Sequence, residues 1–532
     1  MKNYTLHKRE VNFITMVFAI IIIVFTFSCK KELLVENPTS FLGPTNTFKT
    51  TDGFKTAVVG LYELQRRQLD QENYGYFFAG TDIVRTGLAF PNHLYLEKLG
   101  SSIQPTDFEP FWNWGYLLVG NANQILDQLK KSNVVWNTPA EKAQAEAESR
   151  FFRAYAYRVM MYCYGDLPII TELTKPFRND FTRQPVAEVQ RLIIDDFKFA
   201  EANLPEITTT DGRLVKAAAQ HYLAETYLYL NKPDSAEIWA TKVTTSSNYK
   251  LMTSRFGNVL SQPGDAFSDL FKENNTNRSK GNTEGIWVQQ FQYNAIGGGD
   301  ASNQLNWDRR SMVPYYSSIS GFVLCDSLGG RGIGRLVPLK WWKDAYETKD
   351  MRNSQYNIRR RWYYNDISKP ALYGKEIPIT DATRATGALF ESATKFDFGV
   401  TAVNPTFIPS AKDKYMIRLP DTWLLLAEAQ MKLGKMTEAA ASINIVRNRA
   451  NATPVTSAQV TMDYILDERG RELFGEELRR LTLVRTGAFM DRVVRLNPAA
   501  GPNFKPFNVL FPVPQTAIDA NTGAKLTQNP GY

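Results

Sequence analysis

Residues 421–433 (DTWLLLAEAQMKL) and 436–450 (MTEAAASINIVRNRA) are two amphipathic segments joined through Gly434. Apolar side chains recur in both segments at three- and four-residue spacing, which is the pattern of one buried helix face. Glycine commonly follows the end of a helix, because it adopts backbone conformations that other residues avoid. The stretch therefore predicts two antiparallel helices with a tight connection.

A second stretch has the same organisation. Segments 213–230 and 233–247 are amphipathic, and Asn231, Lys232 and Pro233 join them. Proline is tolerated in the first turn of a helix, where its missing N–H has no partner to lose. This stretch predicts another helical hairpin.

Small residues relate the two hairpins. The same interval separates Ala224 from Ala236 and Ala427 from Ala439, and alanine at such positions lets two helices approach closely. Together with Trp423, this spacing fits the tetratricopeptide pattern, a repeat built from helix pairs. Two unrelated helical hairpins are the alternative.

The rest of the chain divides into further helices and one long irregular part. Periodicity predicts a helix that begins near residue 51 and others at about 108–129, 139–164 and 185–203. Residues 250–410 are rich in Gly, Asn, Ser, Pro and Tyr, which indicates loops and short strands. The expected fold class is mostly all-α: a tetratricopeptide-like scaffold of helical hairpins, with a long loop-rich insert that contains short strands.

The first 28 residues have the order of a secretory signal. Basic residues precede an almost uninterrupted apolar run from Val11 to Phe27. Cys29 directly follows a small residue, as in a bacterial lipobox, where the cysteine is acylated. We therefore expect a lipoprotein signal peptide at 1–28, lipid attachment at Cys29 and a polar tether at 29–50. An uncleaved membrane anchor is the alternative, because the apolar run is at the short edge of a membrane-spanning length.

The composition is typical of a globular protein with a large core, since 43% of the residues are hydrophobic and 22% are charged. The net charge is +8 at pH 7, but the basic residues are scattered. This pattern favours a mixed solvated surface over nucleic-acid binding. Cys163 and Cys325 are expected to be free, buried thiols, and a disulfide bond between them is the alternative.

The sequence carries no motif of a catalytic or metal centre. It has no HExxH, GxSxG, P-loop, EF-hand or CxxC pattern. His93 and His221 are expected to be packed or solvated, and Gly330–Gly334 (GRGIG) predicts a flexible loop. We expect no enzyme activity, no cofactor and no metal. A secreted glycosidase that uses two distant carboxylates is the remaining catalytic alternative.

Three stretches carry a family resemblance. They are EAESRFFRAYAY (146–157) with YGDLPII (164–170); RLPDTWLLLAEA (418–429) with ILDERGRELFGEELRR (465–480) and RTG (485–487); and LFPVP (510–514) with LTQNPGY (526–532). Together with the Cys29 leader, they resemble the SusD/RagB family of outer-membrane nutrient-binding lipoproteins. The charges of 465–480 alternate in sign, which predicts one helix with charges that pair at i,i+3 and i,i+4 or cap neighbouring helices.

The resemblance implies a single domain over 51–532, with four tetratricopeptide-like helix pairs. The expected parts are a helical scaffold at 51–249 and 411–490, a loop-rich insert at 250–410 and an irregular tail at 491–532. The resemblance also implies a lipid-anchored protein on the exterior of the outer membrane. Such a protein captures a nutrient, very often a glycan, for a TonB-dependent (SusC-like) transporter. A helical partner protein of an outer-membrane complex, with no glycan site of its own, is the alternative.

A glycan site needs aromatic rings, on which the flat C–H faces of sugars pack, beside polar side chains that bond the hydroxyls. Regions 74–116 and 287–316 have this combination, and the resemblance implies a ligand site on the face that they build. The candidate binding residues are Asp82, Arg85, Trp114, Trp287, Trp307, Tyr315 and Tyr316. For each ring, packing in the core is the competing interpretation.

Overall fold

The computed structural model describes residues 47–69, 73–88, 108–173, 178–293, 295, 298, 306–398 and 410–532. The chain forms two compact units, of which the first comprises the chain up to Lys55 together with Ser132–Val135. The second comprises Thr56–Lys131 and Trp136–Tyr532, and it contains all the sites discussed below. The predicted signal peptide and Cys29 lie outside the described residues.

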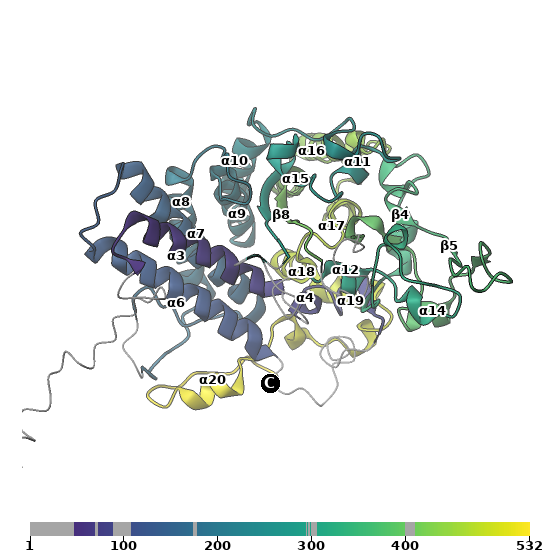
Figure 1. The fold of residues 1–532 in the computed structure, drawn as a ribbon. Coiled ribbons are helices and arrows are strands. Elements are labelled where there is room, and N and C mark those ends of the chain that lie inside the picture. The colour runs from purple at the N-terminus through teal and green to yellow at the C-terminus, as the bar shows by residue number, and fades with distance from the viewer. Residues whose placement is uncertain are drawn as a thin grey trace, which may run out of the picture. The chain divides into compact units, whose positions relative to one another are not determined.

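Long helices form a series in which consecutive members lie side by side (Figure 1). They are α3 (Thr51–Arg66), α6 (Glu109–Lys131), α7 (Pro139–Tyr164), α8 (Val186–Asn203), α9 (Lys216–Tyr229), α10 (Pro233–Thr244), α15 (Leu419–Lys432), α16 (Met436–Arg449) and α17 (Met462–Glu472). From α6 to α10 each helix packs on the next, α10 packs on α15, and α15 packs on both α16 and α17. The helices expected from periodicity are all present, and the mostly α fold class is confirmed.

Both helical hairpins show the close approach that their alanines predict. Ala224 and Ala236 are fully buried between α9 and α10, and Ala427 and Ala439 are fully buried between α15 and α16. Gly434 has a φ of 75°, a left-handed conformation that glycine adopts without strain, and this reverses the chain between α15 and α16. The small side chains thus determine how closely the paired helices pack.

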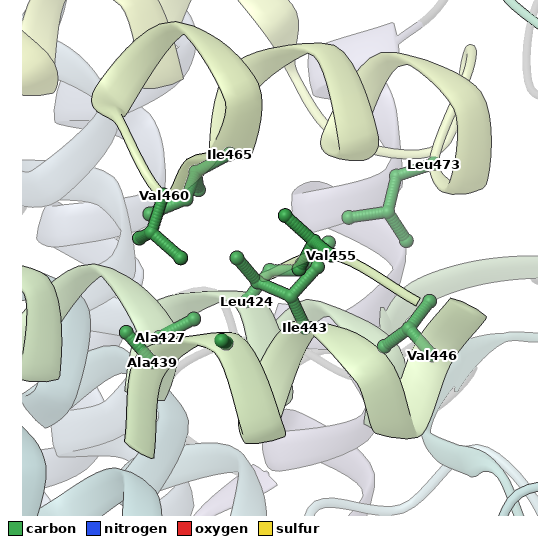
Figure 2. Close-up of a cluster of buried hydrophobic side chains, with 10 residues drawn as sticks. Leu424, Ala427, Ala439, Ile443, Val446, Val455, Val460, Ile465 and Leu473 are labelled. Carbon is green, nitrogen blue, oxygen red and sulfur yellow. The ribbon is translucent and has the colours of Figure 1, made fainter. Parts of the chain in front are cut away.

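The core of the second hairpin is closed by α17. Figure 2 shows Leu424 and Ile443 of the hairpin grouped with Val455, Ile465 and Leu473, all of them buried. Burying an aliphatic side chain of this size contributes about 1.5–3 kcal/mol. We call the ten residues drawn in Figure 2 the apolar cluster: Leu424, Ala427, Ala439, Ala440, Ile443, Val446, Val455, Val460, Ile465 and Leu473.

The insert contains short strands, as its amino-acid composition predicts. Among the described residues, the insert and neighbouring segments form four two-stranded antiparallel sheets. The pairs are β1 (Val84–Thr86) with β3 (Leu336–Pro338), β2 (Gly285–Gln289) with β8 (Lys414–Arg418), β4 (Ile358–Arg359) with β7 (Ser392–Ala393), and β5 (Trp362–Tyr363) with β6 (Glu376–Ile377). The β2–β8 pair connects the insert directly to the scaffold, because α15 begins at Leu419 where β8 ends.

The charged stretch 465–480 is not one helix, so that prediction is wrong. Helix α17 ends at Glu472, and α18 (Arg479–Thr486) begins after a turn. Gly475 in this turn has a φ of 70°, and a Cβ at this position would collide with the ring of Phe396. The left-handed backbone at Gly475 interrupts the helix, which the alternation of charges does not reveal.

Most charges of this stretch are buried, and most of their partners are distant in sequence. Glu472 accepts hydrogen bonds from Arg418 (2.6 Å) and Arg352 (3.0 Å), and it pairs with Arg449. Arg418 also bonds Glu284 at 2.9 Å. We call the following residues the buried charge cluster: Glu284, Arg352, Arg418, Arg449, Glu468 and Glu472. The cluster links the insert, which supplies Glu284 and Arg352, to the scaffold.

The C-terminal tail is more regular than predicted. It begins within α19 (Phe489–Leu496) and contains α20 (Gln515–Ala520). The Nδ2 atom of Asn529 donates to the carbonyls of Tyr164 (2.9 Å) and Phe511 (2.7 Å). The QNPGY stretch therefore fastens the tail to the end of α7.

Within the described part of the chain, no helix combines the length and the apolar character that crossing a bilayer requires. Cys163 and Cys325 form no disulfide bond, as expected. Cys163 is buried, but Cys325 is partly exposed, so the predicted burial holds for Cys163 alone. Burial raises the pKa of the Cys163 thiol to about 12, which keeps it protonated and unreactive.

Candidate functional site

Three segments that are far apart in the sequence meet through glycine backbones. Gly87 follows β1, Gly334 precedes β3, and Gly387 follows α14 (Asp381–Ala385). A Cβ on any of these glycines would collide with the backbone of another. Hydrogen bonding fixes the crossing, because the N–H of Leu88 donates to the carbonyl of Gly334 at 3.0 Å. We call Gly87, Gly334 and Gly387 the glycine junction.

The glycine junction places two of the predicted site residues against the same segment, 385–387. The N–H of Tyr315 donates to the carbonyl of Gly387 at 2.8 Å. The Nη2 atom of Arg85 lies 3.5 Å from the carbonyl oxygen of Ala385. Both side chains are partly exposed, and Leu88 is 37% exposed. Arg85, Leu88 and Tyr315, called here the junction surface, offer a planar cation, an apolar side chain and a phenol ring to a ligand.

Asp82 is buried beneath this surface and does not face solvent. Its carboxylate accepts two hydrogen bonds from Arg479, at 2.8 and 2.7 Å, and one from Arg492 at 2.5 Å. Burial alone would raise the pKa of Asp82, but the two guanidinium groups outweigh this effect and hold its pKa below the usual value. Asp82 therefore stays charged and anchors the start of β1.

Trp114 and Trp287 lie in the core. Trp114 on α6 is 6% exposed, and its Nε1 atom donates to the carbonyl of Leu64 at 2.8 Å. Trp287 on β2 is 2% exposed and packs edge-on against Phe151 and Tyr155 of α7, with ring centroids 5.4 and 5.5 Å apart. Trp114 thus packs among α3, α6 and α7, and Trp287 packs between β2 and α7.

Trp307 and Tyr316 are also buried. The guanidinium of Arg310 lies 4.4 Å from the ring centroid of Trp307. Tyr316 packs on Trp362 with a centroid distance of 5.5 Å, and burial raises its pKa to about 12. Both rings thus support the segment that carries Tyr315. The side chains accessible to a ligand, among the seven proposed from sequence, are those of Arg85 and Tyr315.

Sequence reasoning missed the residues that build this surface. The flexible loop predicted for 330–334 is instead fixed at Gly334, whose N–H donates to the carbonyl of Val313 at 2.9 Å. Leu88 and Gly387 were not singled out, because nothing local distinguishes them from other loop residues. His93 and the rest of 89–107 lie outside the described residues.

An apolar hollow of about 560 Å³ lies elsewhere, between α6, residues 168–173 and 178–181, and α20. Trp112 and Tyr116 of α6 line it together with Phe181, Ala517 and Leu526. None of the seven predicted site residues lines this hollow. Among the described residues, no group of three His, Cys, Asp or Glu side chains is arranged to hold a metal ion.

Two family models match different parts of the chain. The model described as "SusD family" matches residues 386–532, and the model described as "Starch-binding associating with outer membrane" matches residues 59–228. Among curated proteins, the SusD-like protein P25 of Formosa agariphila is 24% identical over 96% of this chain and 97% of its own length. The starch-binding protein SusD of Bacteroides thetaiotaomicron is 25% identical over 79% of this chain and 78% of its own length.

Solved structures share the fold. A laminarin-binding SusD-like protein superposes with a TM-score of 0.71 at 23% identity, over 90% of this chain and 99% of that chain. The surface glycan-binding protein A of Bacteroides thetaiotaomicron, solved with laminarihexaose, gives a TM-score of 0.71 at 18% identity, again over 90% of this chain and 99% of that chain. The fold is that of helical SusD-like binding proteins. The two family models and the curated relatives together support the SusD/RagB family for this chain.

Proposed function

We propose that this chain is a cell-surface lipoprotein that binds a glycan and delivers it to a TonB-dependent outer-membrane transporter of the SusC-like kind. Family membership is the observation that carries the proposal. Relatives with the same fold are named for binding starch and laminarin, and one matching family model is described by starch binding and outer-membrane association. The junction surface supports the same function, because it holds a guanidinium and a phenol against the same segment, 385–387.

The anchoring part of the proposal rests on the N-terminal sequence. Acylation of Cys29 would attach the chain to the outer membrane, and residues 30–50 would act as a tether that lets the binding domain face the exterior. Radiolabelled palmitate incorporated into the wild-type chain, and absent from Cys29→Ala, would support this assignment. Equal labelling of both chains would overturn it.

A second candidate function is a helical partner protein without a glycan site of its own. The burial of Asp82, Trp114, Trp287, Trp307 and Tyr316 favours this alternative, because it leaves few of the expected contact residues accessible. The two functions predict different results when binding of the isolated protein to polysaccharides is measured.

Affinity electrophoresis of residues 30–532 in gels that contain single polysaccharides tests the main proposal. Retardation by one neutral glycan, reduced in both Arg85→Ala and Tyr315→Ala, is the expected result. Each substitution should weaken binding about tenfold, since one charge-assisted hydrogen bond or one ring contact contributes on the order of 1.5 kcal/mol. Arg191→Ala and Tyr373→Ala, at exposed positions outside the junction surface, are the matched controls. No retardation by any glycan would favour the partner-protein function.

A further inference from the structure

A second concave site lies in the insert, away from the junction surface. A cleft of about 530 Å³ opens between residues 258–274, the η7 turn (Asp326–Leu328), residues 355–359 and residues 394–398. Its lining is mainly polar, and none of the residues of the junction surface contributes to it. We propose that this cleft is a separate binding site for a neutral oligosaccharide.

The floor of the cleft is held in place by internal hydrogen bonds. Asp265 caps α11 (Ala266–Asp269) through the N–H of Ser268 at 2.7 Å, and its carboxylate accepts hydrogen bonds from Asn357 Nδ2 at 3.0 and 3.1 Å. On the other side, Arg359 Nη2 donates to Asp397 at 2.6 Å and to the carbonyl of Ser327 at 3.0 Å. These bonds join all four segments that form the cleft or flank it. The site is therefore preorganised, which lowers the entropy cost of binding.

The rim, in contrast, carries polar side chains that have no partner in the described part of the chain. Gln262, Lys272, Glu273, Asn274 and Gln355 line the cleft, and no hydrogen bond or ion pair joins any of these side chains to another described residue. Burial raises the pKa of Glu273 above its ordinary value. A partly desolvated carboxylate beside free amides presents both acceptors and donors, which is what the hydroxyl groups of a sugar require.

The charges around the cleft cancel. The lining includes three cations, Lys272, Arg359 and Lys395, and three anions, Glu273, Asp326 and Asp397. Arg359 is paired with Asp397, and Lys395 is paired with Glu476 at 2.6 Å. An anionic ligand such as a phosphate or a uronic acid would gain little from a site with no net charge, and it would meet the Glu273 carboxylate. This balance selects a neutral ligand.

Tyr356 supplies the surface on which a sugar ring can pack. It lines the cleft, it is partly exposed, and no described residue bonds its hydroxyl group. Gln355 lines the same cleft, so an aromatic ring and an amide are both available to a ligand there, the combination that sugar recognition needs. The cleft volume falls in the range of small-molecule sites, which run from about 300 to 1,000 Å³.

Hydrogen–deuterium exchange of residues 30–532 locates this binding directly. The probes are laminarihexaose and maltohexaose as neutral ligands and hexagalacturonate as an acidic one. We expect a neutral probe to protect peptides that cover 258–274 and 351–359. Protection should persist in Arg85→Ala/Tyr315→Ala, and in Glu273→Ala/Gln355→Ala it should need at least about tenfold more ligand. Glu438→Ala, an exposed carboxylate on α16, is the control.

The outcomes separate this site from the junction surface. Protection of the cleft without protection near Arg85 and Tyr315 would support the cleft while removing the junction surface from the proposed function. Protection confined to the junction surface would overturn the cleft proposal and leave the proposed function intact. Absence of cleft protection with both neutral probes, or stronger protection by hexagalacturonate, would also overturn it. A Tyr356→Phe variant, which keeps the ring, should bind nearly as well as the wild type, whereas Tyr356→Ala should not.

Discussion

Helix α17 faces two different interiors along its length. Ile465, near its start, packs in the apolar cluster, whereas Glu468 and Glu472, near its end, lie in the buried charge cluster. Apolar packing is non-directional and tolerates small adjustments, but a buried ion pair depends on each partner, because an unpaired charge in the interior is costly. The comparison teaches that apolar packing holds the start of α17 to the scaffold hairpin, whereas ion pairs hold its end to Arg352 of the insert.

The largest expected effect comes from removing one member of the buried charge cluster. Glu472→Ala leaves Arg352, Arg418 and Arg449 without a shared carboxylate, and we expect a loss of about 3–5 kcal/mol in the free energy of unfolding. Chemical denaturation followed by circular dichroism measures this loss. The exposed Glu438→Ala is the control. Equal unfolding midpoints for both variants would show that the cluster does not hold the insert.

Acid should weaken the same cluster before it affects the apolar cluster. Burial favours a higher pKa for Glu468, but Arg352, Arg471 and Arg447 outweigh it and lower the pKa to about 2. A carboxyl with a depressed folded-state pKa stabilises the fold above its unfolded pKa of about 4.3, and this contribution is lost as the pH falls toward about 2. We expect stability to decline across that window by about 3 kcal/mol from Glu468 alone.

Unfolding midpoints measured from pH 6 down to pH 2 test this expectation. The variant Glu468→Gln should be less stable than the wild type at pH 6, and its stability should depend less on pH within the window. If the stability of the two proteins changes in parallel between pH 6 and pH 2, the assigned role of Glu468 is contradicted.

A smaller effect is expected in the apolar cluster. Ile443→Val removes one methylene group from a fully buried side chain, which should cost about 0.5–1.5 kcal/mol. Because no charge is involved, this loss should be the same at pH 7 and pH 4. A loss that changes with pH would show that the two interiors are coupled through α17.

The smallest effect is expected for ion pairs on the surface. Arg191 bonds Glu188 on α8 at 2.8 Å, and both side chains are well exposed. Arg191→Ala should change the free energy of unfolding by less than about 0.5 kcal/mol, because solvent screens the pair. A loss as large as that of Glu472→Ala would remove the distinction between buried and exposed charges.

Local patterns were sufficient to predict the scaffold. Each hairpin is determined by residues close together in the sequence. These are the alanine pairs in the helices and Pro233 and Gly434 at the connections, so local patterns predict both hairpins. The charged stretch was misinterpreted, because two partners of Glu472 that determine its burial, Arg352 and Arg418, precede it by 120 and 54 residues. Periodicity reports only on residues a few positions apart, so it does not reveal contacts between residues this far apart in the sequence.

The candidate site was harder for a related reason. Trp287 and Tyr315 have similar polar and aromatic surroundings in the sequence, yet Trp287 packs on Phe151 and Tyr155, which lie in α7. A ring in a loop-rich region packs inward when a distant helix offers it an aromatic partner, and sequence alone does not identify that partner. Arg85 and Tyr315 stay accessible, and the glycine junction holds both of their segments against residues 385–387.

The glycine junction also has a consequence for how such a protein can change its ligand. The close approach at the crossing is between main-chain atoms, so it constrains the three glycines and leaves the neighbouring side chains freer to differ. Substitutions at positions such as 85, 88 and 315 can therefore alter recognition without disturbing the support beneath them. The junction thus separates the glycines that the crossing requires from side chains that can vary, so a few surface substitutions could change the ligand that such a surface binds.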